Sequence, residues 1–66
     1  MAPTIQEILP TREAAIARAR ELFKSDATVC VIESFREPGK FFVENGSPMI
    51  RVFERVIWRE GKEVKS

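Results

Sequence analysis

Residues 48–59 read PMIRVFERVIWR, and this stretch decides the fold that the sequence predicts. Apolar and charged residues alternate along it, and a period of two is typical of a half-buried β-strand. It is longer than any other strand-like run in the chain and contains the single tryptophan, Trp58. We therefore predict a long strand from Pro48 to Arg59, on which a small sheet is built.

Two shorter strand-like runs precede it, and we expect them to pair in the same sheet. Residues 28–35 (TVCVIESF) and 41–44 (FFVE) are rich in β-branched and aromatic residues, as strands are. Between them, Glu37-Pro38-Gly39-Lys40 has the proline and glycine of a type II turn. A hairpin closed by that turn places Phe35 opposite Phe42.

The loop at residues 45–48 then returns the chain, so that Phe42 faces Arg51 and the three strands form an antiparallel meander. In this register residues 55–59 extend past the end of the middle strand. We expect this apolar overhang to lack a partner within the chain, which makes it an adhesive edge.

A helix is predicted before the sheet. Thr11 is a good N-cap, and residues 12–24 are dense in strong helix formers. Five apolar residues share one face at helical spacing: Ala15, Ile16, Ala19, Leu22 and Phe23. That face is expected to lie on the sheet.

The first ten residues allow two interpretations. Thr4 and Glu7 match a capping box, which would start a helical turn that Pro10 stops. The alternative is a short extended strand from Ile5 to Leu9, which Pro10 favours slightly because it pushes Leu9 toward extended geometry.

The predicted fold class is therefore α+β, with one helix packed on a three-stranded antiparallel β-meander in the order α-β-β-β. A short N-terminal edge strand would make the order β-α-β-β-β. The chain forms a single small domain over residues 1–66, with flexible segments at 1–10 and 60–66. Residues 62–66 are either a frayed tail or a short return strand.

Composition argues against histidine-dependent catalysis, histidine-based metal sites and membrane-spanning segments. Among 66 residues there is no histidine, one cysteine and a net charge of +1, and no apolar run approaches the roughly 20 residues that span a bilayer. The first residues lack the basic start and apolar core of a signal peptide. We expect a cytoplasmic protein that is not an enzyme and carries no metal or cofactor.

Two sets of residues could in principle take part in catalysis or metal binding, and we interpret both as structural. The predicted register places Glu33 opposite Glu44, a carboxylate pair that we interpret as part of a surface network with Arg51. Cys30 lies mid-strand with no histidine to activate it, so we interpret it as a buried structural thiol.

The face of the sheet away from the helix is predicted to be unusually apolar for a water-facing surface. We predict a partner interface on this face and on the overhang, formed by Phe35, Phe42, Arg51, Phe53, Arg55, Ile57 and Trp58. The sequence thus predicts a non-enzymatic protein-interaction module with a regulatory role, which forms a homodimer or occludes a protein partner. The alternative is a sheet surface that binds single-stranded nucleic acid, with the phenylalanines stacking on bases and the arginines contacting phosphates.

Overall fold

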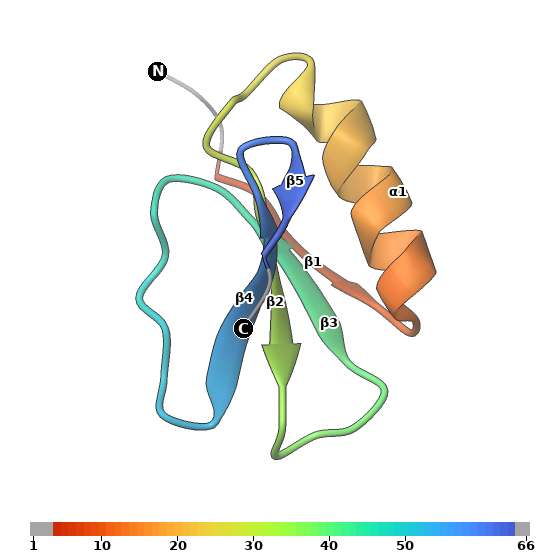
Figure 1. Cartoon of the computed structure of the whole chain (residues 1–66), viewed down its shortest axis with the longest axis vertical. Coiled ribbons are helices and arrows are strands. Elements are labelled where there is room, and N and C mark those ends of the chain that lie inside the picture. Colours follow the sequence, from red (N-terminus) through yellow and green to blue (C-terminus); the bar gives the residue numbers. More distant parts are fainter. Residues whose placement is uncertain (1–3, 65–66) are drawn as a thin grey trace.

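The computed structural model describes residues 4–64. Its elements are β1 (Gln6–Leu9), α1 (Arg12–Phe23), β2 (Cys30–Ser34), β3 (Phe41–Glu44), β4 (Glu54–Arg59) and β5 (Lys62–Glu63). The fold class is confirmed: one helix packs on an antiparallel sheet (Figure 1). The first three and last two residues of the predicted flexible ends lie outside the described part, and the rest of those ends contains β1 and β5.

The sheet has the order β1-β3-β2-β4-β5, and every neighbouring pair is antiparallel. The N-terminal segment is a strand, as in the second of the two interpretations, and it pairs with β3. The last long strand does not have its predicted neighbour, because β4 pairs with β2 rather than β3. The central strand is therefore β2, and the chain is buried from Val29, which directly precedes this strand, to Ile32.

The predicted register of the first hairpin is also corrected. The turn at Glu37–Lys40 is present, with the Lys40 N–H donating to the Glu37 carbonyl at 3.2 Å and Gly39 at φ 84°. However, β2 ends at Ser34, and Phe42 lies opposite Ile32 instead of Phe35. A slip by an odd number of residues exchanges the two faces of β2.

The helix matches its prediction closely. Thr11 is the N-cap, and its Oγ1 accepts a hydrogen bond from the Ala14 N–H at 3.1 Å. Ala15, Ile16 and Ala19 are buried against the sheet. Because two of these three are alanines, the helix backbone lies close to the strands.

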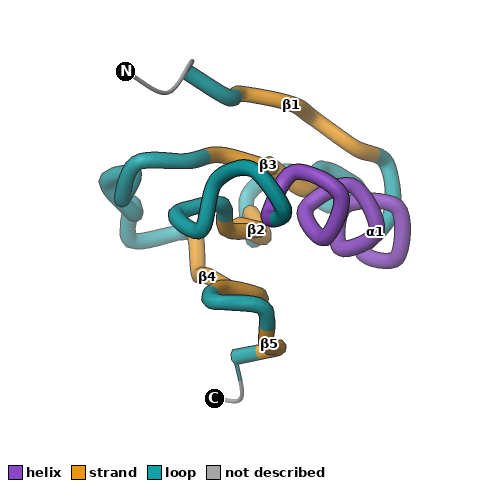
Figure 2. The backbone as a smooth tube through the Cα atoms, turned by 90° about the horizontal axis from the view of Figure 1, so that it is seen from above, coloured by secondary structure: helices purple, strands orange, loops and turns teal. Residues whose placement is uncertain are grey.

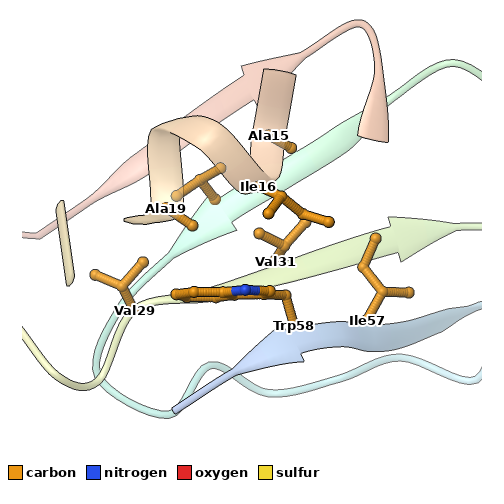
Figure 3. Packing of buried hydrophobic residues seen from close by; sticks show 8 residues of the cluster. Ala15, Ile16, Ala19, Val29, Val31, Ile57 and Trp58 are labelled. Atoms are coloured by element: carbon orange, nitrogen blue, oxygen red, sulfur yellow. The ribbon is translucent and has the colours of Figure 1, made fainter. Parts of the chain in front are cut away.

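The core lies between α1 and one face of the sheet (Figure 3). Its buried members are Ala15, Ile16, Ala19, Val29, Val31, Val43, Ile57 and Trp58. The Trp58 indole, only 1% exposed, lies edge-on to the Phe23 ring with 5.7 Å between the ring centroids. Trp58 is therefore part of the core beneath the helix.

Residues 45–53, which we call the crossing segment, are not part of a strand. Gly46 and Ser47 have positive φ angles of 74° and 57°, which turn the chain out of the sheet after β3. A second turn, in which the Glu54 N–H donates to the Arg51 carbonyl at 2.9 Å, leads into β4. The predicted strand from Pro48 therefore begins only at Glu54.

The crossing segment lies on the side of the sheet opposite α1 (Figure 2). Ile32 faces that side and is nevertheless 1% exposed, and Cys30 is 6% exposed. Central strands that are buried on both faces need a layer on each side. The helix supplies one layer and the crossing segment supplies the other.

Candidate protein-interaction site

Three apolar side chains on the crossing segment or beside it are more than 60% exposed. Val52 is 98% exposed, Met49 is 92% exposed and Ile8, on β1, is 62% exposed. Isolated exposed hydrophobic residues are ordinary, whereas a contiguous exposed apolar patch is a candidate interaction surface.

A groove of about 480 Å³ lies between β1, β3 and the crossing segment, which we call the outer groove. Its apolar wall is formed by Ile8, Phe42, Met49 and Phe53. Ile8 and Phe42 are directly opposite in the β1–β3 pair, so their side chains share this face of the sheet. Met49 and Phe53 reach it from the crossing segment.

Acidic residues line the other part of the outer groove. Glu44 and Glu54 both line it, together with the oppositely charged Arg51. Burial, and next the negative charge of Glu54, raises the pKa of Glu44 above its ordinary value, while Arg51 acts in the opposite direction. Glu54 is already engaged, because its Oε1 accepts the Arg51 N–H at 3.0 Å.

The predicted pairing of Glu33 with Glu44 is wrong. Glu33 lies opposite Phe41 and Glu44 opposite Cys30, so the two carboxylates face different sides of the sheet. Glu33 instead accepts a hydrogen bond from Arg55 Nε at 3.0 Å. The odd register shift of the hairpin separates the two residues.

The predicted interface residues that remain at the surface form cation–π contacts. Arg55 lies 5.2 Å from the ring centroid of Phe35, which is 56% exposed. Phe53 is half-buried, with Arg36 at 5.4 Å and Arg51 at 5.9 Å from its centroid. These aromatic faces are thus already covered by guanidinium groups of the same chain.

Ile57 and Trp58 do not lie on the predicted interface. Ile57 is 4% exposed and Trp58 is 1% exposed, and both belong to the core under α1. The predicted unpaired overhang at residues 55–59 is also corrected, since it pairs with β2 along one edge and with β5 at its end. The hairpin that β5 adds was the second of the two interpretations of the C-terminal segment.

Cys30 is an enclosed thiol. Burial, and next the negative charge of Glu44, raises its pKa to about 11, so it is protonated at neutral pH. Within residues 4–64 there is no group of histidine, cysteine, aspartate or glutamate side chains arranged to hold a metal ion. The helix that the structure describes is too short and too polar to cross a membrane.

A second hollow, of about 460 Å³, lies on the α1 side of β1, and we call it the inner hollow. Ile5, Leu22 and the ion-paired Glu7 and Arg18 line it. Arg18 binds Glu7 through two hydrogen bonds of 2.9 Å, and this contact lowers the pKa of Glu7. The strand β1 therefore has a hollow beside it on each face.

The predicted interface did not include Ile8, Met49 or Val52. The signal for Met49 and Val52 was present in the four consecutive apolar residues from Val29 to Ile32. Such a run indicates a strand buried on both faces, which requires a covering segment. Ile8 belonged to a segment whose structure the sequence left open.

Comparison with known proteins adds no identification. No family model matches the chain, and no significant match is found among the curated proteins or among the solved structures.

Proposed function

We propose that this chain is a non-enzymatic protein-interaction module with a regulatory role in the cytoplasm, which works by covering a protein surface. The observation that carries this proposal is the exposure of Met49, Val52 and Ile8 beside the apolar wall of the outer groove. Exposed apolar anchors next to a groove, with charged residues around them, are the usual composition of a protein interface.

The side chains of the groove support binding better than catalysis. Glu44 is the carboxylate whose protonation the surroundings favour, but no histidine or available thiol lies beside it as a second catalytic group. General acid–base catalysis needs a proton acceptor or donor held within hydrogen-bonding reach of a bound substrate. Met49 and Val52, the most exposed apolar residues, carry no such group.

The nucleic-acid alternative receives less support from the geometry. Stacking on bases requires open aromatic faces, whereas guanidinium groups cover Phe53 and one side of Phe35. The outer groove also places Glu44 and Glu54 where a phosphate backbone would pass. A protein partner is compatible with both features.

The proposal is tested by replacing the exposed anchors. We expect the wild-type protein to bind a fluorescent dye specific for exposed hydrophobic surface, or to associate in light scattering at high micromolar concentration. The double variant Met49→Lys/Val52→Lys should lose most of the dye binding and keep its fold, because neither side chain is buried.

A charge-matched control separates the loss of apolar surface from the gain of two lysines. Ala17 and Ala27 are exposed and lie away from the groove, so Ala17→Lys/Ala27→Lys should behave as the wild type does. A wild-type protein that stays monomeric and binds no dye would contradict the proposed function.

A further inference from the structure

The outer edge of β1 faces no other strand among the residues that the structure describes. The strand is at the end of the sheet, and among residues 4–64 its only strand partner is β3. The Ile5 N–H is directed toward β3, where it donates to Asn45 Oδ1 at 2.9 Å. Because backbone groups alternate in direction along a strand, the N–H and C=O groups of Gln6 and Ile8 are directed away from β3.

This edge lacks most of the features that usually protect an edge strand from pairing. Its register with β3 runs from Gln6 to Leu9 without a bulge. Its one charged side chain, Glu7, is held and neutralised by Arg18. The opposite edge of the sheet differs, since β5 contains only Lys62 and Glu63.

The two hollows beside β1 are placed to receive a further strand. A strand added along this edge directs alternate side chains to the two faces of the sheet. One set would enter the outer groove beside Ile8 and Met49, and the other would enter the inner hollow beside Ile5 and Leu22. Such addition joins main-chain hydrogen bonds with pockets for alternate side chains.

We propose that β1 pairs antiparallel with the β1 of a second copy of this chain, about a two-fold axis at Glu7, and so forms one continuous sheet across two subunits. This inference rests on the proposed function and names its partner. In this register Gln6 lies opposite Ile8 of the partner subunit, so the outward backbone groups of both strands bond reciprocally. A two-fold dimer uses the same edge twice, as isologous interfaces do.

The side chains of β1 are suited to pairing with themselves in this way. Ile5 and Leu9 are partly buried apolar residues on the core face, and the register places Ile5 opposite Leu9 of the partner subunit. At the axis Glu7 meets Glu7 of the partner subunit, but each carboxylate has its own Arg18. Two positive and two negative charges therefore meet, and their sum is zero.

A cysteine at the axis tests the register directly. Glu7 would form a non-hydrogen-bonded pair, in which Cα atoms are about 4.5 Å apart, and that separation permits a disulfide. In a Cys30→Ala background, Glu7→Cys should oxidise to a covalent dimer at low micromolar protein concentration. The control is Lys62→Cys, on the opposite edge at β5, which should remain largely monomeric. Equal dimer yields from the two variants would overturn the proposal.

A proline on the edge tests the backbone pairing. Proline is tolerated on edge strands where the N–H faces solvent, so Gln6→Pro should keep the fold while removing an outward donor. Light scattering should show a dimer for the wild type and for Gln6→Ala, and at least about tenfold weaker association for Gln6→Pro. Circular dichroism establishes that all three are folded.

Two further results would overturn the sheet-extension dimer. One is a wild-type protein that is monomeric at high micromolar concentration, and the other is a Gln6→Pro variant that is folded and still fully dimeric. A monomer that still binds the hydrophobic dye through Met49 and Val52 would overturn the dimer alone, and the proposed function would stand with a different protein partner.

Discussion

Ile57 and Trp58 are consecutive residues of β4, yet both side chains are buried in the core beneath α1 (Figure 3). The pairing of β4 with β2 explains this. Val31 lies opposite Trp58 and Ile32 opposite Val56, so Ile57 is one extra residue in the ladder. Such a bulge interrupts the alternation of side chains, and two neighbours then face the same side.

The first prediction concerns this bulge. Ile57→Ala should lower the free energy of unfolding by about 2–5 kcal/mol, because it leaves a cavity in the core. Val52→Ala removes two methyl groups from a residue that is 98% exposed, and it should change stability by no more than about 0.5 kcal/mol. Chemical denaturation of both variants measures the difference. Equal losses would mean that Ile57 is not a core residue.

The second prediction concerns Asn45, whose side chain joins three parts of the chain. Its Oδ1 accepts the Ile5 N–H at 2.9 Å, and its Nδ2 donates to Asp26 Oδ2 at 2.8 Å. Asn45→Asp keeps the first contact but places two carboxylates together, so we expect a loss of about 1–3 kcal/mol. The loss should shrink in acid, as either the introduced carboxylate or that of Asp26 is protonated.

The control for Asn45 is Asn45→Ala, which removes both contacts without adding charge. Its loss should shrink less in acid, because it removes only the hydrogen bond that helps to lower the pKa of Asp26 and adds no second carboxylate. Thermal unfolding at neutral pH and near pH 4 compares the two variants, and parallel behaviour would contradict the electrostatic explanation.

The third prediction concerns Glu44, whose pKa in the folded protein lies above its ordinary value of 4.5. A raised pKa means that stabilisation by the protonated form is full below the unfolded-state pKa and is lost as the pH rises through the folded-state pKa. Glu44→Gln should therefore stabilise the protein at pH 7, by less than about 1 kcal/mol because the side chain is partly solvated.

The same comparison at acid pH is the check on Glu44. Near pH 3 the wild-type carboxyl is protonated in both states, and the two proteins should have nearly equal stability apart from their hydrogen bonding. A stabilising effect of Glu44→Gln that grew in acid would contradict the raised pKa.

The fourth prediction concerns the β4–β5 turn. Glu60 has a φ of 53°, in the left-handed region that residues with a Cβ atom rarely occupy, and Gly61 follows at 77°. Two-residue hairpins of this kind favour Asn-Gly. Glu60→Asn should raise the free energy of unfolding by roughly 0.5–1 kcal/mol. The matched variant Glu63→Asn, in β5, should give no gain.

Much of the fold followed from local sequence signals. Thr11, the alanine-rich helix and the turn at Glu37–Lys40 were predicted because capping, propensity and turn chemistry depend on a few adjacent residues. Strand order depends on long-range competition instead. Either β1 or the last strand could pair with the free edge of β3, and the sequence does not show which of them does. The alternation of residues 48–53 also fits both a strand and a segment that covers the sheet.

The candidate site was predicted only in part. Phe35, Phe42, Arg51, Phe53 and Arg55 are at or near the surface, as expected, and a single odd register shift changed which neighbours they meet. Trp58 was predicted to lie at a partner interface, and its burial places it in the core instead. Bulges such as the one at Ile57 leave no sequence mark that periodicity detects.

Neighbouring residues of the crossing segment differ in how far they are exposed to solvent. Phe53 is half-buried and Ile50 is 37% exposed, and both line hollows on this side of the sheet, while Met49 and Val52 are more than 90% exposed. Folding therefore places no constraint on the exposed pair, and the chain can exchange these residues for others without losing its core. Binding specificity in this molecule can evolve, or be engineered, at two positions while the architecture that supports them stays fixed.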